Sequence, residues 1–241
     1  MKTDAVLHPN HYIAIVTGAS SGIGLAISRM LCDLQFEVYG YGRDFSKTDF
    51  SRNNFHPVSL DLRDTPALTA YIKKKKKIGN IYILVHAAGC AYYGLHEELS
   101  PRKISDICRT NLEVPMILSQ MLLRNLKKEE GYIFSISSIC ATSSNPHGAC
   151  YGATKAGLSN FNRSLFEESR KSHLKVVTIA ADMTDTNLYR NADFGIGTDK
   201  LSYLTPEEVA DTIKYALSLR EGAVMSEILL RPQLHSITRK K

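Results

Sequence analysis

The chain has 241 residues, of which 44% are apolar and 22% charged, so it can bury a sizeable core and does not have the composition of a disordered protein. Its formal net charge of +6 comes from two basic runs, Lys73 to Lys77 and Arg239 to Lys241. Without these eight charges the net charge is about −2, so we expect solvated lysines and no nucleic-acid partner.

Short β-branched or apolar runs alternate with helical stretches along the chain. The predicted strands span residues 12–17, 36–42, 55–60, 81–86, 131–137, 174–181 and 224–230. Strands that alternate with helices form right-handed βαβ units, which build a parallel sheet covered on both faces. Because no linker, repeat or composition shift divides the chain, we predict one doubly wound Rossmann-type α/β domain over residues 1–241, with about seven strands.

The first predicted strand leads into TGASSGIGLAISRML, where three glycines have the spacing G-x-x-x-G-x-G. Glycines let the backbone approach a pyrophosphate, and the next helix offers free N–H groups and the positive end of its dipole. The loop follows a strand and opens an amphipathic helix, the context that a dinucleotide site requires. We therefore predict a phosphate cradle, and not a glycine turn without a ligand. Its predicted contacts are Gly18, Ser20, Ser21, Gly22, Ile23 and Gly24.

The second predicted strand ends at Gly42 and Arg43, where an acid would bind the adenosine ribose of NAD. Glycine leaves room for a 2′-phosphate, and a guanidinium pairs with that group bidentately. These residues favour NADP(H) over NAD(H); the alternative is that Arg43 is a surface residue and Asp44 binds the ribose. Asp61, which closes the third strand, is a candidate acceptor for the adenine amine or a helix N-cap.

Between the fifth and sixth predicted strands, ACYGATKAG places Tyr151 four residues before Lys155. On a helix these side chains share one face, about one turn apart. Taken alone, the pair is typical of an ordinary surface helix. It gains significance only together with the other motifs.

Together these motifs resemble the short-chain dehydrogenase/reductase family over nearly the whole chain. The resemblance rests on Thr17-Gly18-x-x-x-Gly22-x-Gly24, Asp61-Leu62, Asn111, Ser138 and Tyr151-x-x-x-Lys155, in the family's order and spacing. It implies that Ser138 binds the substrate oxygen, that Asn111 binds a water that relays protons, and that Lys155 also holds the nicotinamide ribose. Thr186 falls where a family threonine bonds the carboxamide. The resemblance further implies cofactor contacts at Leu62, Ala88 and Gly89.

The catalytic roles also follow from acid–base chemistry. Hydride transfer to a carbonyl carbon leaves an alkoxide unless a positioned acid protonates the oxygen. A phenol near pKa ~10 is a poor base at neutral pH, and a nearby ammonium favours its ionised form. We therefore expect Tyr151 to exchange the proton and Lys155 to lower its pKa.

Two segments depart from the family pattern. His86-Ala87-Ala88-Gly89 stands where Asn-Asn-Ala-Gly is common, so either His86 bonds neighbouring backbone as that asparagine does or the network differs. We expect His86 to be structural. Ala181-Asp182 stands where Pro-Gly is usual, which puts a carboxylate near the nicotinamide site.

Residues 185–205 are irregular and follow the sixth strand, where ligand-covering loops sit in such folds. We predict a substrate-covering loop, against the alternative of a long connector. Candidate substrate contacts are Tyr92, Tyr93, His147 and Cys150, which are equally consistent with a polar loop rim.

The sequence thus predicts an NADP(H)-dependent oxidoreductase that acts on a carbonyl or secondary alcohol of a small molecule. The alternatives are a non-catalytic NADP(H)-binding redox sensor or scaffold, and a nicotinamide-dependent epimerase or dehydratase. We expect no metal site, because no histidine pair has ligand spacing. By resemblance we expect a homo-oligomer, a dimer or a tetramer.

The cysteines and the apolar runs indicate the compartment. Five scattered cysteines without a C-x-x-C pair favour a reducing cytoplasm over a disulfide framework. The start, MKTDAVLHPNHY, lacks a signal-peptide core, and the near-apolar run 81–91 is too short to span a bilayer. We expect a soluble cytoplasmic protein with no membrane partner.

Overall fold

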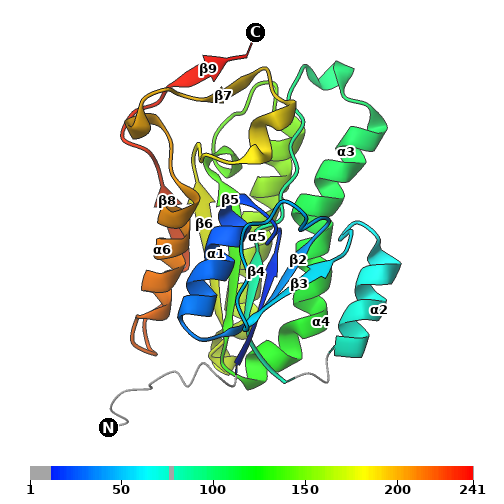
Figure 1. Ribbon diagram of the computed structural model, residues 1–241, viewed down its shortest axis with the longest axis vertical. Helices are drawn as coiled ribbons and strands as arrows, with labels where there is room; N and C mark the ends of the chain where they lie inside the picture. Colours follow the sequence, from blue (N-terminus) through cyan, green and yellow to red (C-terminus); the bar gives the residue numbers. More distant parts are fainter. Residues whose placement is uncertain (1–11, 76–78, 241) are drawn as a thin grey trace.

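A parallel sheet of seven strands, in the order β3-β2-β1-β4-β5-β6-β8, forms the centre of the computed structural model, which describes residues 12–75 and 79–240 (Figure 1). Each of the seven predicted strands is present, and their ends differ from the prediction by about three residues at most. The strands are β1 Tyr12–Thr17, β2 Glu37–Gly42, β3 Phe55–Ser59, β4 Asn80–His86, β5 Tyr132–Ser138, β6 Lys175–Ala181 and β8 Glu227–Leu230.

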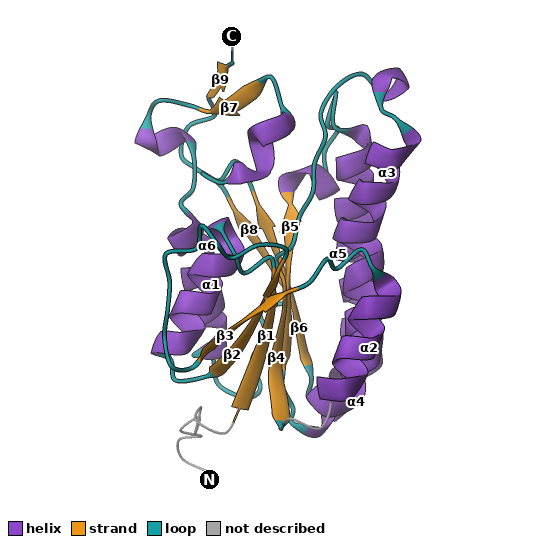
Figure 2. Ribbon diagram, turned by 45° about the vertical axis from the view of Figure 1, so that its right-hand side comes forward, coloured by secondary structure: helices purple, strands orange, loops and turns teal. Residues whose placement is uncertain are grey.

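Helices cover both faces of this sheet, as Figure 2 shows. One face carries α1 (Gly22–Asp33) and α6 (Pro206–Leu217); the other carries α2 (Thr65–Lys75), α4 (Val114–Lys128) and α5 (Ala149–Ser169). Helix α3 (Pro101–Cys108) precedes α4. Each face buries its own apolar core, with Ile27 and Ile213 in the first and Leu68 and Leu118 in the second. The predicted doubly wound fold is therefore confirmed.

Strand order positions the functional end of the molecule. The chain moves outward from β1 to β2 and β3, then returns to the other side of β1 with β4. The loops after β1 and β4 therefore diverge in opposite directions, which opens a crevice at the carboxyl ends of the strands.

The segment 185–205 is more regular than its sequence indicated. It contains the short 3₁₀ helices η6 (Asn187–Asn191) and η7 (Lys200–Ser202), with the strand β7 (Phe194–Ile196) between them. Strand β7 pairs antiparallel with β9 (Ile237–Arg239), near the end of the chain. The sequence could not indicate this pairing, because two three-residue strands carry no periodic signal of their own.

Packing within one chain explains both glycines of α5. A Cβ on Gly152 would lie 3.3 Å from the carbonyl oxygen of Cys140, and one on Gly157 would lie 3.2 Å from Leu112. Packing around the turn after β5 and against the segment before α4 therefore accounts for these small residues. They are no sign of a subunit interface.

Some sequence-based expectations fall on residues outside the described part of the chain. These are the segment 1–11, which bears on a signal peptide, and Lys76, Lys77 and Lys241 of the basic runs. Over residues 12–75 and 79–240, no helix is long and apolar enough to cross a membrane. All five cysteines are free, as expected.

Candidate active site

A cavity of about 500 Å³ opens at the carboxyl ends of the strands. The loops after β1, β2, β4, β5 and β6 line it, and so do α5 and the C-terminal segment near Ile237. It contains all of the predicted glycine-loop contacts together with Arg43, Asp61, Leu62, Ala88, Gly89 and Thr186. Ser138, Tyr151 and Lys155 line the same cavity.

The loop after β1 has the geometry of a phosphate cradle. Gly18 and Gly22 have φ angles of 69° and 53°, which favour glycine. A Cβ on Gly24 would lie 2.3 Å from the carbonyl oxygen of Gly18, so the turn closes only without a side chain. Thr17 fixes the loop to its neighbour, because its hydroxyl donates to Val85 O and accepts from the N–H groups of residues 87 and 88, each at 3.1 Å.

The two cofactor hypotheses concern the residues at the end of β2. A Cβ on Gly42 would lie 3.0 Å from the side chain of Ser20, so an acid at this position would crowd the cradle. Arg43 lines the cavity from an exposed position. The carboxylate of Asp44 accepts hydrogen bonds from the N–H and the hydroxyl of Ser46, and Asp44 is not among the residues that line the cavity.

Asp61 does not cap a helix. Its carboxylate accepts two hydrogen bonds from the guanidinium of Arg63, at 3.1 and 2.8 Å, and Asp64 instead accepts from the N–H of Ala67 at the start of α2. Bonding to Arg63 holds the pKa of Asp61 below its usual value.

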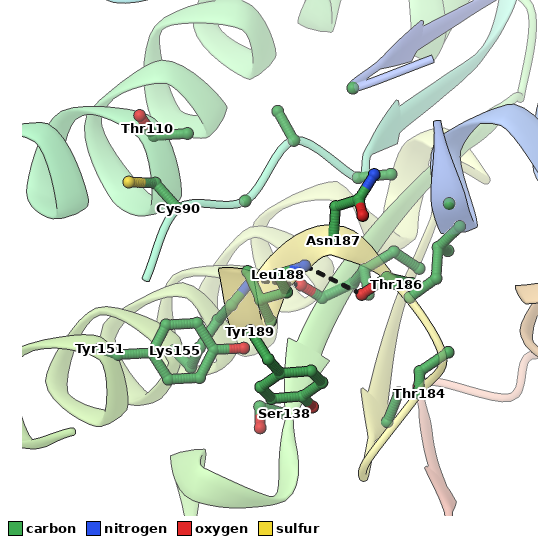
Figure 3. A pocket seen from close by; sticks show the side chains of 18 of the residues that line it. Cys90, Thr110, Ser138, Tyr151, Lys155, Thr184, Thr186, Asn187, Leu188 and Tyr189 are labelled. Atoms are coloured by element: carbon green, nitrogen blue, oxygen red, sulfur yellow. Dashed lines mark hydrogen bonds between the residues drawn. The ribbon is translucent and has the colours of Figure 1, made fainter. Parts of the chain in front are cut away.

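Ser138, Tyr151 and Lys155 meet at one end of the cavity, beside Tyr189 of η6 (Figure 3). Ser138 ends β5, and the other two lie one turn apart on α5. All three are more than nine-tenths buried. The ammonium of Lys155 lies 5.6 Å from the centre of the Tyr151 ring and donates to the carbonyl oxygen of Ile136 at 2.7 Å.

Without a bound cofactor, the electrostatics of this pair differ from the prediction. Burial raises the pKa of Tyr151, with Tyr189 and Cys140 adding to the rise and a hydrogen bond with Ser138 opposing it. Burial also lowers the pKa of Lys155 from 10.5 to about 8. Desolvation is therefore the main cause of both shifts, and the Lys155 ammonium bonds a backbone carbonyl.

Asn111 lies in a π-helical turn, η3 (Arg109–Glu113), between α3 and α4. Its side chain accepts from the N–H of Cys90 at 2.9 Å and donates to Cys90 O at 2.9 Å and to Thr154 at 3.1 Å. The helix is therefore distorted at this residue. Asn111 does not line the cavity, and its amide ties the loop after β4 to α5, so the water-relay role by this side chain gains no support.

His86 does not bond neighbouring backbone, so the network here differs from the family pattern. It is 2% exposed, and its Nε2 pairs with the hydroxyl of Ser119 on α4 at 3.0 Å. Its Nδ1 has no hydrogen-bond partner among the described residues. Burial, with a smaller contribution from Lys155, lowers the pKa of His86 from 6.5 to about 3.

Replacing His86 with asparagine is expected to reduce the loss of stability in acid. The unfolded chain binds this proton more readily than the folded protein between pH 6.5 and about 3, so folding is weakened as the pH falls through that window. The effect amounts to at most about 1.4 kcal/mol per pH unit. Urea unfolding of the parent and the variant at several pH values measures it. His173→Asn, at an exposed position, is the matched control; equal acid dependence in the parent and in His86→Asn would contradict this prediction.

Hydrogen bonds within the segment after β6 hold it in place. The Asp182 carboxylate lines the cavity and accepts from the N–H of Met183 at 2.7 Å. Thr186 accepts from the N–H of Leu188 at 3.3 Å and packs against Gly22, since a Cβ there would lie 3.1 Å from its methyl group. Thr186 therefore lies directly against the glycine loop.

Two of the four predicted substrate contacts are misplaced. Tyr92 and Tyr93 line the cavity, whereas His147 and Cys150 do not. Cys150 packs with Leu99 and Ile107 in a separate apolar cluster, because consecutive helical residues point about 100° apart and Tyr151 takes the cavity side.

His147 is exposed, with a φ of 62°, and its carbonyl accepts from the N–H of Gly94. The sequence interpretation also missed residues that do line the cavity, namely Tyr189, Phe194, His235 and Ile237. The first two were visible as aromatics in the predicted covering loop. Nothing in the sequence indicated that His235 and Ile237 line the cavity.

Residues 12–194 match the sequence profile of the short chain dehydrogenase family, so the chain belongs to this family of oxidoreductases. It is 28% identical over 229 residues to 3-oxoacyl-[acyl-carrier-protein] reductase FabG of Vibrio cholerae, which covers 90% of this chain and 94% of that protein. It is 29% identical over 230 residues to an uncharacterized oxidoreductase of Staphylococcus haemolyticus, which covers 92% and 98%. An alcohol dehydrogenase from Thermococcus sibiricus, solved with 5-hydroxy-NADP, superposes with a TM-score of 0.83 at 23% identity and covers 93% of this chain and 98% of that one.

Proposed function

We propose that this protein is an NADP(H)-dependent reductase or dehydrogenase that interconverts a carbonyl group and a secondary alcohol of a small molecule, with residues 1–241 acting as one domain. One observation carries the proposal. Ser138, Tyr151 and Lys155, each less than 8% exposed, line the same cavity as a glycine loop that closes only without side chains.

The residues present fit a dinucleotide. The loop Gly18–Gly24 and the first N–H groups of α1 would hold the phosphates, Asp61 and Leu62 the adenine side, and Ala88, Gly89 and Thr186 the nicotinamide side. When bound, NADP(H) supplies or accepts the hydride. The fit rests on the positive φ angles of Gly18 and Gly22 and on the close backbone contact at Gly24, which leave the backbone free of side chains where a phosphate would approach it.

Residues of this chain bind the substrate oxygen and supply its proton. Ser138 donates a hydrogen bond to the substrate oxygen and fixes it near the phenol. Tyr151 gives its proton to that oxygen as negative charge develops there. Lys155 would hold the ribose of the bound cofactor, and its ammonium would stabilise the resulting phenolate.

The chemistry separates this proposal from its rivals. A redox sensor or scaffold has no physical need for a buried serine, phenol and ammonium in the cofactor cavity. An epimerase or dehydratase returns the hydride, so it consumes no cofactor overall. Net oxidation of NADPH at 340 nm with a panel of ketones and aldehydes is the test. The proposal fails if no carbonyl compound in a broad panel causes net oxidation while the nucleotide binds.

The preference for NADP(H) rests on residues 42 and 43. A Cβ on Gly42 would lie 3.0 Å from the Ser20 side chain, which disfavours an acid there, and Arg43 offers a guanidinium to a 2′-phosphate at the cavity rim. Related structures do not decide the matter. A metagenomic short-chain oxidoreductase was solved with NADP, and 4-hydroxyisoleucine dehydrogenase was solved with NADH.

Replacing Arg43 with alanine is expected to weaken NADP⁺ binding by about 10- to 100-fold, the value of one or two charge-assisted hydrogen bonds. NAD⁺ binding should change little, because NAD⁺ lacks the 2′-phosphate. Isothermal titration calorimetry with both nucleotides measures the ratio. Arg124→Ala, an exposed arginine of α4, is the matched control. Equal effects of Arg43→Ala on both nucleotides would remove the basis for the preference.

We further propose a homo-oligomer, a dimer or a tetramer, that works in the cytoplasm. Five free cysteines, two of them lining the cavity, fit a reducing compartment. Sedimentation equilibrium of the purified protein tests the assembly.

A further inference from the structure

The substrate end of the cavity is built from aromatic rings that continue from Tyr151. The ring of Tyr93 lies 6.2 Å from that of Tyr151 and 4.9 Å from that of Phe194, in an edge-to-face arrangement. Tyr189 lies 5.7 Å from Phe194 and 6.3 Å from Tyr93. These rings come from the loop after β4, from α5, from η6 and from β7, so the tertiary structure has assembled them. We call Tyr93, Tyr189 and Phe194 the aromatic wall.

The C-terminal segment holds this wall in place. Strand β9 pairs with β7 so that Ile237 lies opposite Ile196, and the hydroxyl of Thr238 donates to Ile196 O at 2.7 Å. On the other side of Phe194, the backbone N–H of Lys240 donates to Asp193 O at 2.7 Å. Its ammonium donates to Tyr189 O at 2.5 Å. The tail therefore contacts the chain on both sides of Phe194, and Ile237 itself lines the cavity.

Two cations and one carboxylate near this end of the cavity are engaged with the protein. Arg190 donates to Asn187 O at 3.0 Å, and Lys240 bonds Tyr189 O as described. Asp182, whose carboxylate accepts from the N–H of Met183, adds a negative charge at this end. An anionic substrate would lose its hydration among rings while these cations hold backbone carbonyls, whereas a flat apolar group meets ring faces and edges.

The inference that follows rests on the proposed function. We propose that residues 235–240 form one side of the substrate pocket and, with the aromatic wall, select carbonyl compounds and alcohols that carry an uncharged aromatic ring beside the reacting carbon. Acetophenone is the simplest such ketone. Pyruvate, which is short and anionic, is the contrasting probe.

The test compares three variants with the parent. A chain that ends at Gln233 removes β9, Ile237→Ala removes the side chain that lines the cavity, and Leu234→Ala is the control. Leu234 is an exposed aliphatic residue of the same tail that does not line the cavity. Two measurements are made: saturation-transfer NMR of acetophenone and of pyruvate on the complex with NADP⁺, and KM and kcat for their reduction with NADPH.

We expect the parent to bind acetophenone about tenfold or more tighter than pyruvate. The shortened chain should weaken acetophenone binding by about tenfold or more, and Ile237→Ala by about three- to tenfold. Leu234→Ala should change it by less than about twofold. Affinity for NADP⁺ should stay the same in all three, since the tail lies outside the cradle.

The outcomes keep this inference apart from the proposed function. Turnover that prefers pyruvate, or acetophenone turnover indifferent to the tail, overturns the inference while the function stands. Acetophenone binding that depends on the tail but gives no turnover with any carbonyl compound supports the binding inference and overturns the function. If the shortened chain does not fold, Ile237→Ala together with Phe194→Leu decides the matter.

Discussion

Replacing Tyr151 with phenylalanine is expected to lower kcat/KM for the substrate by about 10³-fold, which corresponds to about 4 kcal/mol of transition-state stabilisation. The substitution removes one hydroxyl from a side chain that is 5% exposed and leaves its ring in contact with Tyr93. The oxygen that gains charge then has no positioned proton donor, while Ser138 still binds it. Steady-state kinetics with NADPH measure the effect.

Binding and folding should survive this change. NADP⁺ affinity is expected to stay within about twofold, and the melting temperature within about 3 °C, since removing a buried hydroxyl changes stability by about 1 kcal/mol. Tyr132→Phe is the matched control, because Tyr132 is equally buried but packs against Phe134 in the core. A Tyr151→Phe protein that reduces the substrate as fast as the parent would contradict the proposed mechanism.

Replacing Lys155 with methionine is expected to lower kcat/KM by about 10²- to 10⁴-fold and, at the same time, to leave the cofactor-free protein at least as stable as the parent. The two effects have one cause. Burial lowers the pKa of this ammonium from 10.5 to about 8, which means that folding must desolvate a cation for the sake of the cofactor-bound state.

The pH dependence shows in which direction Lys155 changes the stability of the folded protein. Below pH 8 the ammonium is charged in both the folded and the unfolded chain, so the full cost of its burial is present. As the pH rises from about 8 to 10.5, the folded protein loses this proton first and the cost disappears. The stability advantage of Lys155→Met, at most about 3 kcal/mol near neutral pH, should therefore shrink over that window in urea unfolding.

Lys175 provides a matched control. It is 6% exposed, donates to the carbonyls of Glu130 and His173 at 3.3 Å, and has a pKa lowered mainly by burial. It begins β6, at the end of the sheet away from the cavity. Lys175→Met should change stability in the same direction without loss of turnover. A Lys155→Met protein that is fully active, or one destabilised by several kcal/mol at neutral pH, would contradict the prediction.

The structure places some of the predicted site residues in the cavity and others outside it, for physical reasons. The glycines, Arg43, Ser138, Tyr151 and Lys155 line one cavity because each follows the carboxyl end of a parallel strand or lies on the cavity face of α5. Cys150 was misplaced although it adjoins Tyr151, since neighbours on a helix face different ways. Asn111 lies in a π-helical turn, and its amide bonds Cys90 and Thr154.

The sequence alone determined the seven strands, the phosphate cradle and the phenol and ammonium on one helical face. These features depend on local periodicity, glycine geometry and spacings of a few residues, which are properties of short segments. Only the tertiary structure decided that the covering segment pairs with the C-terminal strand, that rings from four segments meet beside Tyr151, and that burial sets the proton equilibria of Tyr151, Lys155 and His86. Those features depend on contacts between residues far apart in the chain and on the removal of water from buried groups. No short segment of the sequence reveals either of these.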